Sequence, residues 1–236
     1  MRIVGCEILH CNAGWRDFSF LKLMTDENIT GISEYNECYG SPGLSGIIRR
    51  LVERVKDMDP LAHEHIHQCL YAATRQAPGG VNQQAIAAIE NALLDIKGQA
   101  LNIPVYDILG GAIRKEIPVY WSHCGTYIWR PEIAELCGVE AIRKTEDLVN
   151  LGKRVKDQGF LGLKTNMITF NEDVGASLYM PGTAGRPGWP DLNVPSSLIG
   201  QLRDQLIAMQ EGAGSDVGVR LDLNFNFKPE GYRQVT

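Results

Sequence analysis

The sequence predicts two units: an α+β unit of antiparallel strands and helices, followed by a parallel β/α barrel of the TIM type that is truncated after its third strand. Three strand-like runs come first, and helical stripes of apolar residues follow them. After Gly110-Gly111 the pattern changes to alternating strands and helices, which is typical of a parallel sheet. Residues 112–236 amount to about half of the ~250 residues of a complete barrel.

The first unit is expected over residues 1–111 and begins with a three-stranded meander. Turn residues at 12–14 and 25–28 separate its β-type runs. Helices follow, each with apolar residues at helical spacing, and the last is expected to close at Gly98. The strands are expected near 3–9, 18–23 and 29–35, and the helices at 46–56, from Asp59-Pro60, and from Gly79-Gly80 to Gly98.

The second unit, residues 112–236, contains the first three β/α repeats of the predicted barrel. A long Gly- and Pro-rich loop, 167–197, is expected to leave the end of the second strand and to wall the barrel mouth. A small three-stranded α/β layer is the alternative, but three parallel strands with bare edges would be a poor sheet alone. The strands are expected at 117–121, 159–164 and 217–223, and the helices at 139–158, 198–210 and from Pro229.

The composition is that of an ordinary globular protein, with 44% apolar and 22% charged residues and a net charge of −5. Disorder and binding along a nucleic-acid backbone are disfavoured, and no apolar run approaches the ~20 residues that cross a bilayer. The first residues do not form a signal-peptide core, and the six cysteines include no CxxC pair. We therefore expect a cytoplasmic protein whose partner is a small molecule, with no role at a membrane.

One motif suggests zinc chemistry. His63-Glu64-His65-Ile66-His67 matches HExxH, which places two imidazoles on one helix face with Glu as the base. The alternative is a polar helix surface that happens to be rich in histidine. We favour the alternative, because His63 lies in the first turn after Pro60 and no pattern for a third ligand follows. Phosphate-binding loops and GxSxG elbows are absent from the sequence.

Two charged residues stand where strands of the second unit end. Lys164 follows one predicted strand and Asp222 closes the next, and such ends meet at the mouth of a β/α barrel. Because side chains alternate along a strand, Asn166 points with Lys164, and Asn224 with Asp222. A cation beside a carboxylate suits either a metal-bound anionic intermediate or a plain ion pair, and spacing alone does not decide between them.

The chain resembles the mandelate racemase/muconate lactonizing enzyme branch of the enolase superfamily. The match is most specific in the helix at 87–98 and in Pro104-Val105-Tyr106-Asp107-Ile108-Leu109-Gly110-Gly111, which is similar to the "PVYDLLGG" link from that family's capping domain into its enolase-like barrel. Residues 159–166 and 217–226 resemble its second and third barrel strands. The resemblance implies an α+β cap over the barrel, and abstraction of the proton α to a carboxylate with Mg²⁺ as Lewis acid.

The resemblance also implies roles for individual residues. Asp222 matches the first of three carboxylate metal ligands, Asn224 the second residue of a DxN motif, and Lys164 the first lysine of a KxK motif. Asn166 occupies the second lysine position, and an amide cannot accept the proton. Asn166 and Asn224 are therefore expected to be substrate contacts. The resemblance then implies a histidine base on a later barrel strand, while Lys164 holds the substrate carboxylate by charge. The other two metal ligands and that base belong to strands four to seven of the family's barrel.

Loops of the cap set specificity in this family. The matching stretches are 12–17, where Trp15 and Arg16 are candidate contacts for an acidic, hydroxylated substrate, and 38–43. An ordinary turn with an exposed tryptophan explains the first stretch equally well. His123, just past the first predicted barrel strand, is a further candidate substrate contact, with an ordinary loop histidine as its alternative.

Together these features predict a Mg²⁺-dependent lyase or isomerase, with a sugar-acid (aldonate or aldarate) dehydratase as the first hypothesis. A racemase or cycloisomerase shares the same first step and is the second hypothesis. A non-catalytic fragment, which lacks the remaining metal ligands and the base, is the third. The family resemblance also implies a homo-oligomer.

Overall fold

The computed structural model describes residues 1–38, 40–172, 175–181, 191 and 193–236. The chain divides into two compact units, Met1–Lys115 and Glu116–Thr236. The sequence predicts this boundary after Gly111, and in the structure it lies four residues later, after Lys115.

The N-terminal unit is built on an antiparallel sheet with the strand order β1-β2-β3. In β2 every second residue is buried and the residues between them are partly exposed, because one face of the sheet meets the helices. In the pairing register Cys6 lies opposite Leu23, and Leu21 opposite Ser33. The strands are β1 (Ile3–Asn12), β2 (Asp17–Thr25) and β3 (Thr30–Tyr35).

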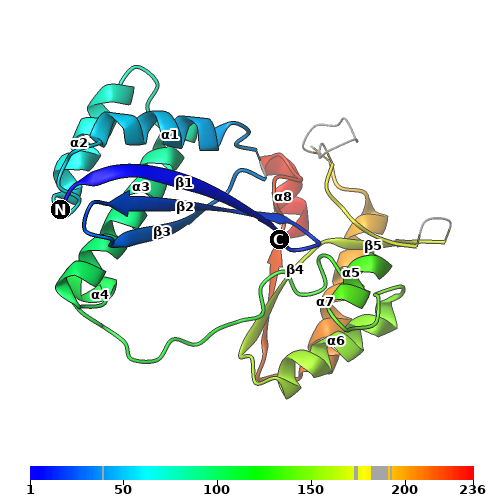
Figure 1. Ribbon diagram of the computed structural model, residues 1–236. Helices are drawn as coiled ribbons and strands as arrows, with labels where there is room; N and C mark the ends of the chain where they lie inside the picture. Colours follow the sequence, from blue (N-terminus) through cyan, green and yellow to red (C-terminus); the bar gives the residue numbers. More distant parts are fainter. Residues whose placement is uncertain (39, 173–174, 182–190, 192) are drawn as a thin grey trace. The chain divides into compact units, whose positions relative to one another are not determined.

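Helices cover one face of this sheet and enclose the first hydrophobic core (Figure 1). Helix α3 packs against β2 and β3, while α1 packs against β1 and α3. The core consists of aliphatic side chains from the sheet and the three longer helices, together with Tyr35 of β3. The helices are α1 (Leu44–Val55), α2 (His63–Thr74), α3 (Gly80–Leu101) and the short α4 (Val105–Ile108).

Two glycines allow backbone segments to pack closely, one against α3 and one near its C-terminal end. A Cβ atom at Gly31 of β3 would lie 2.0 Å from the carbonyl oxygen of Ala92, so only glycine fits between this strand and the helix. Gly98 was expected to end α3, but the helix continues to Leu101. Instead, the chain beyond the helix turns back and passes close to Gly98, where there is little room for a side chain. Asn102, at a φ of 53°, is the left-handed residue that ends the helix.

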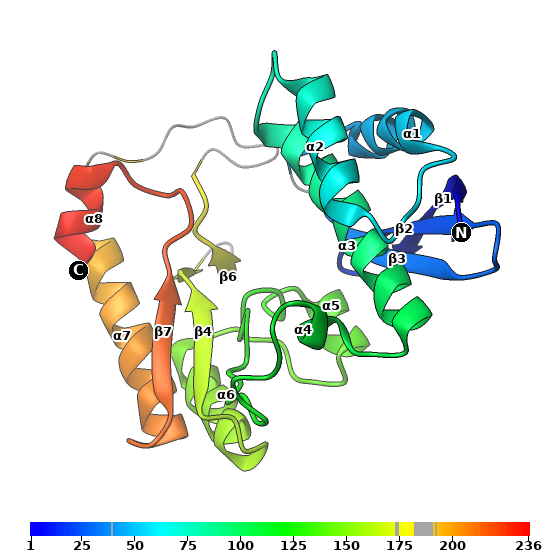
Figure 2. The same ribbon diagram turned by 90° about the vertical axis from the view of Figure 1, so that its left-hand side faces the viewer.

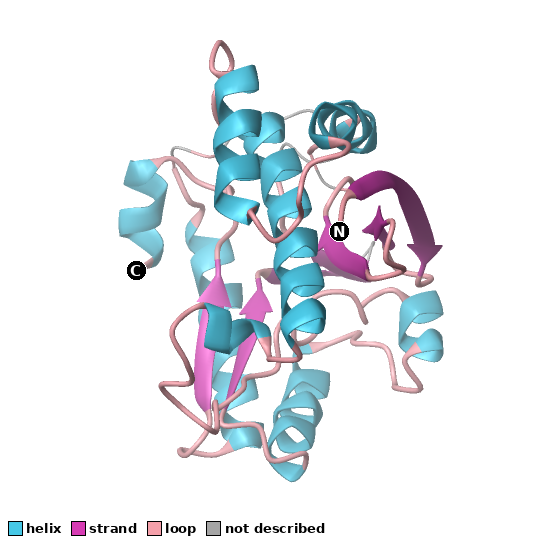
Figure 3. Cartoon of the chain, turned by 60° about the vertical axis from the view of Figure 1, so that its left-hand side comes forward, coloured by secondary structure: helices cyan, strands magenta, loops and turns pink. Residues whose placement is uncertain are grey.

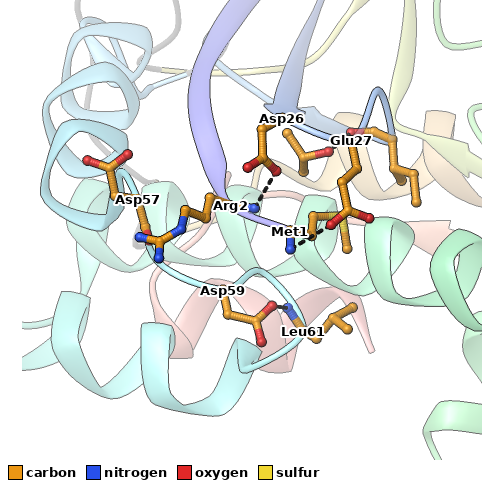
Figure 4. Close-up of polar contacts among 9 residues, drawn as sticks. Met1, Arg2, Asp26, Glu27, Asp57, Asp59 and Leu61 are labelled. Atoms are coloured by element: carbon orange, nitrogen blue, oxygen red, sulfur yellow. Dashed lines mark hydrogen bonds and ion pairs between the residues drawn. The ribbon is translucent and has the colours of Figure 1, made fainter.

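Polar contacts attach the first residues of β1 to two turns (Figure 4). The amino group of Met1 lies 2.7 Å from a carboxylate oxygen of Glu27, and the backbone N–H of Arg2 donates to Asp26 at 2.6 Å. The guanidinium of Arg2 donates to the backbone oxygen of Asp57 at 3.4 Å. The start of β1 is therefore held to the β2–β3 turn and to the connection between α1 and α2.

The second unit contains two parallel strands, β4 (Gly162–Asn166) and β7 (Gly218–Asp222), which run side by side in Figure 2. Helices α6 (Thr145–Asp157) and α7 (Ser196–Ala213) follow the strand–helix alternation that the sequence predicts, and they pack against each other. A second core lies between these helices and the sheet, and a third smaller cluster surrounds Phe227.

The rest of the second unit corrects the predicted loop 167–197. This segment contains the antiparallel pair β5 (Ile168–Asn171) and β6 (Gly175–Leu178), and its last two residues begin α7. Residues 173–174, 182–190 and 192 of this predicted loop lie outside the described residues. Two short helices, α5 (Pro131–Leu136) and α8 (Pro229–Val235), complete the unit, whose helices and strands are coloured separately in Figure 3.

Two predicted elements are shorter in the structure. The strand expected at 117–121 is reduced to a single parallel bridge between Trp121 and Leu163, and Pro118 has no N–H with which to extend it. The helix expected over 139–158 begins only at Thr145. The carboxylate of Asp147 accepts the backbone N–H groups of Arg143 and Lys144 and so sets this start.

Candidate functional site

An ion pair joins the carboxyl ends of β4 and β7. In the parallel register Asn166 lies beside Asp222, and Lys164, two residues earlier, is on the same side of its strand. The Lys164 Nζ atom donates to Oδ2 of Asp222 at 3.1 Å, and the two side chains are 24% and 33% exposed. The structure thus brings together the two charged residues that the sequence placed at strand ends, where solvent still reaches them.

Asp222 is held in its charged form. The backbone N–H of Asn224 donates to its Oδ1 atom at 2.9 Å. This hydrogen bond, followed by the hydrogen bond and charge of Lys164 and a charge contribution from His123, holds the pKa of Asp222 below its usual range, although burial acts against the shift. Asp222 is therefore an ionised acceptor at neutral pH and a suitable oxygen ligand for a hard cation.

Asn224 adopts an unusual backbone conformation just after β7. Its φ is 50°, and its carbonyl oxygen accepts the Tyr232 hydroxyl of α8 at 2.5 Å, which fixes the turn. Its side-chain Nδ2 atom is buried and, within the described residues, has no hydrogen-bond partner. A buried donor without a partner is costly, so this amide is ready to donate to an oxygen supplied by a ligand.

Asn166 has a different environment from that expected of a substrate contact. Its side chain is only 2% exposed, its Oδ1 accepts the hydroxyl of Thr126 at 2.7 Å, and its Nδ2 donates to the backbone oxygen of Asp222 at 3.2 Å. Gln205 of α7 donates to the Asn166 backbone oxygen at 2.7 Å. Asn166 therefore ties the Thr126 segment and β7 to the end of β4 through its side chain, and α7 through its backbone oxygen.

Sequence reasoning missed Thr126 and Gln205. Gln205 lies on the buried stripe of α7 with Leu202 and Met209, so a polar residue inside an apolar stripe was the available signal. Thr126 lies in a turn within an irregular segment, where no periodic signal marks it.

His123 lies in the loop that follows Trp121. The next residue, Cys124, donates its N–H to the Lys164 carbonyl at 2.7 Å, so the loop runs beside the end of β4. His123 itself has a φ of 54°, and its ring centre lies 5.6 Å from that of Tyr127. The loop thus brings His123 near enough to affect the charge equilibrium of Asp222.

Trp15 and Arg16 lie in the β1–β2 turn of the N-terminal unit. The Arg16 guanidinium stacks over the ring of Phe18 at 4.6 Å and over that of Trp15 at 5.4 Å. Both side chains are half-buried. In the other predicted specificity loop of the cap, 38–43, Tyr39 lies outside the described residues.

The HExxH histidines form contacts between helices. The Nδ1 atom of His63 lies 3.3 Å from the Lys97 ammonium, and that of His67 lies 3.0 Å from the carboxylate of Glu90. Both partners belong to α3, so these contacts favour helix packing over zinc chemistry. Across the described ranges, no group of three or more His, Cys, Asp or Glu side chains is arranged to hold a metal ion.

The residues present at the strand ends fit one part of a magnesium site. Mg²⁺ takes six oxygen ligands and is often held by one or two carboxylates, with water and substrate completing the set. Asp222 offers one ionised, partly exposed carboxylate. The Lys164 ammonium shares that carboxylate, so further oxygens would have to come from other groups.

Comparisons with known proteins point to one family. Residues 11–110 match the sequence profile described as "Mandelate racemase / muconate lactonizing enzyme, N-terminal domain". A D-galactonate dehydratase of Xanthomonas axonopodis pv. citri is 35% identical over 127 residues, which cover 51% of this chain and 31% of that protein.

Solved structures are similar over the whole chain. A protein of Burkholderia xenovorans strain LB400, described as a candidate L-alanine-DL-glutamate epimerase, is 40% identical with a TM-score of 0.90, and the match covers 100% of this chain and 58% of that one. A second structure of that protein holds magnesium and fumarate. A member of the enolase superfamily from Salmonella Typhimurium shares the fold, with 21% identity and a TM-score of 0.82 over 99% of this chain and 57% of that chain.

The chain therefore spans little more than half the length of these structures and about a third of that curated relative. In the part of the chain that the structure describes, none of the helices combines the length and apolar character that a bilayer crossing requires.

Proposed function

Residues 11–110 are an N-terminal domain of the mandelate racemase/muconate lactonizing enzyme family, and from this premise we propose that the chain is part of a Mg²⁺-dependent sugar-acid dehydratase. The observation that carries the proposal is the pairing of Lys164 with Asp222 at the ends of neighbouring parallel strands. The similarity to D-galactonate dehydratase supports the choice of a hydroxylated acid as substrate.

Each residue of the pair has a proposed role. Asp222 is one carboxylate ligand of the metal, and Mg²⁺, when bound, stabilises negative charge on the substrate carboxylate as a Lewis acid. Lys164 is the proposed catalytic residue, because its ammonium can hold and neutralise that carboxylate. The unpartnered Nδ2 of Asn224 donates a hydrogen bond to the same group.

Dehydration requires two bond-breaking events. A base takes the proton from the carbon next to the carboxylate, and the hydroxyl on the following carbon leaves with a proton as water. The resulting enol then becomes an α-keto acid. Asn166 cannot be the base, and its amide is engaged by Thr126 and Asp222, so we assign it to holding the strand ends in place. A base outside this chain's described residues, a histidine by family resemblance, completes the proposal.

Three further residues are proposed substrate contacts. His123 lies in the loop beside the end of β4, and its ring can bind a hydroxyl or carboxylate oxygen. Trp15 and Arg16, in the N-terminal unit, supply a stacked aromatic and a cation of the kind that binds an acidic, hydroxylated molecule. Self-association into a homo-oligomer stays a prediction of the family resemblance.

The direct test is turnover of sugar acids by the protein purified from its native source. With Mg²⁺ present, we expect D-galactonate or a related aldonate or aldarate to give an α-keto acid. Asp222→Asn should lower the rate by about 100-fold or more, as expected when a group that acts on developing charge is lost. Asp216→Asn, an exposed change just before β7, is the matched control and should leave the rate unchanged. Failure of every sugar acid to react would contradict the dehydratase proposal.

A racemase or epimerase is the second candidate, and the 40% identity to the Burkholderia protein favours it. Both reactions begin with loss of the α proton. In D₂O an epimerase would exchange this hydrogen for deuterium without forming an α-keto acid, and proton NMR measures both outcomes.

A non-catalytic fragment is the third candidate, because the described residues supply a single carboxylate at the strand ends. We expect the 236-residue chain to bind Mg²⁺ only weakly in a calorimetric titration, since tight sites need more fixed oxygens. The mass of the native protein separates the possibilities further: a mass well above 26.1 kDa would mean that additional strands can supply the missing ligands. A native mass of 26.1 kDa with no turnover would favour the fragment.

A further inference from the structure

A pocket in the N-terminal unit carries a concentration of positive charge. It lies between α1, the end of α2 and the start of α3, and it has a volume of about 760 Å³. This is within the usual range for pockets that bind small molecules. Three arginines line it: Arg50 and Arg54 on α1, and Arg75 just after α2.

These charges have no counterpart in the described structure. The lining includes no aspartate or glutamate, and none of the three guanidinium groups makes an ion pair or side-chain hydrogen bond with any described residue. Arg50 and Arg54 are four positions apart on one helix, so they face the same side and repel each other. An anion placed among them would remove this repulsion.

The dipole of α2 explains only part of the cluster. Arg75 follows the last turn of α2, where a cation is stabilised by the helix carbonyl groups. Arg50 and Arg54 lie in the middle and last turn of α1 and gain nothing from the end of α2. Arg49, also on α1, is directed elsewhere, because its charge acts on Cys6 of β1.

We propose that this pocket binds a small organic anion that carries two or more carboxylate or phosphate groups. Arginine suits this ligand because its planar fork binds such groups through paired hydrogen bonds. The pocket also has apolar lining from Ile47, Leu51 and the alanines at 72, 73 and 77, which would contact a carbon skeleton and favour an organic anion over an inorganic one. This site is separate from the residues of the proposed dehydratase reaction, and the proposal does not depend on that reaction.

Calorimetric titration of the 236-residue chain tests the proposal with four probes at matched ionic strength. Citrate and fructose 1,6-bisphosphate represent the carboxylate and phosphate classes, pyrophosphate represents an inorganic polyanion, and acetate a single charge. We expect saturable binding of citrate or the bisphosphate with a Kd of about 1 mM or below, and binding of pyrophosphate and acetate at least about tenfold weaker. Which of the first two binds more tightly identifies the ligand class.

Variants locate the binding. Arg54→Gln should weaken binding about tenfold or more, because it removes a charge-assisted contact. Arg54→Lys should recover part of the loss, while Arg49→Gln, the same charge change on the same helix, should leave binding within about twofold. If Arg54→Gln lowers the thermal midpoint, Arg50→Gln replaces it.

Three results would overturn the proposal. The first is no saturable binding of citrate or the bisphosphate up to about 10 mM. The second is equal binding of pyrophosphate, which would mean that the carbon skeleton contributes nothing. The third is an equal effect of Arg49→Gln and Arg54→Gln, which would reduce the binding to general electrostatic attraction.

Discussion

Glu37 shows how one carboxylate can organise a loop. It accepts the N–H of Gly43 at 2.8 Å through Oε1 and the hydroxyl of Ser45 through Oε2, and Ser45 in turn lies 2.6 Å from the Tyr35 hydroxyl. Burial opposes the charge of Glu37, but the hydrogen bonds from Ser45 and Gly43 outweigh it and hold the pKa below its usual range. The charged form thus caps the start of α1.

This capping predicts a specific pH dependence. Because the folded pKa of Glu37 is lowered, its contribution to stability is complete above the unfolded pKa of about 4.3 and is lost as the pH falls through the folded pKa. Glu37→Gln should lower the free energy of unfolding by about 1 kcal/mol near pH 7, and by less at lower pH. Urea unfolding of both proteins between pH 3 and 7 measures the difference. A constant difference across that range would contradict the prediction.

Thr126 offers a second test at the scale of single residues. Thr126→Val keeps the shape but removes the hydroxyl that donates to Asn166, which leaves a buried amide oxygen unpaired. We expect a loss of about 1–3 kcal/mol in unfolding free energy. Thr126→Ser keeps the hydroxyl and is the control. Equal loss in both variants would mean that methyl packing, and not the hydrogen bond, is responsible.

Individual site residues could be predicted from sequence where they stand at the end of a predicted strand. Lys164 and Asp222 could be identified because a charged residue at a strand end is visible in a linear pattern, and the structure places them 3.1 Å apart. The buried environment of Asn166 could not be identified, since its partners Thr126 and Gln205 are each about 40 positions away. Hydrogen bonds between such distant residues leave no local signal.

At the scale of elements, α6 and α7 meet through glycines. A Cβ atom at Gly212 would lie 1.9 Å from the Val149 carbonyl oxygen, and one at Gly152 would lie 2.4 Å from that of Met209. The backbones of the two helices therefore touch, and neither position has room for a methyl group.

This contact predicts opposite effects for the same substitution on one helix. Gly212→Ala should destabilise the second unit by about 1–3 kcal/mol, because α7 must move away from α6. Gly200→Ala, also in α7, meets nothing within 4 Å and should stabilise by about 0.5–1 kcal/mol through helix propensity. Thermal unfolding followed by circular dichroism gives both values. A neutral Gly212→Ala variant would show that the helices can separate without cost.

Helices and strands could be predicted from sequence where one buried face made apolar residues recur at a regular spacing. The alternation in β2 and the apolar stripe of α3 are such cases. The segment expected to form a strand at 117–121 has no buried face that would impose an alternating pattern, because Ile117 and Val119 are 74% and 61% exposed. The hairpin of β5 and β6 lacks an alternating pattern strong enough to stand out from its Gly- and Pro-rich surroundings.

At the scale of the whole molecule, each unit has its own hydrophobic core. Among the residues that the structure describes, the first core draws on Met1–Lys115 alone, and the second and third draw on Glu116–Thr236 alone. A unit that buries a complete core can fold by itself. We expect a fragment of residues 1–115 to unfold cooperatively on heating, with the far-ultraviolet spectrum of a mixed α and β protein. A non-cooperative, featureless melt would contradict this expectation.

The outer side of β7 has a practical consequence. Within the described residues β7 hydrogen-bonds to β4 alone, and close by, Phe225 is 88% exposed. The unpaired backbone donors and acceptors along such a strand edge can pair with the same edge of another molecule. Purified at high concentration, the 236-residue polypeptide should scatter light increasingly with time. Replacement of the exposed Phe225 by lysine, Phe225→Lys, should slow that growth, and the rate of turbidity increase would measure how strongly this exposed edge limits the usable concentration.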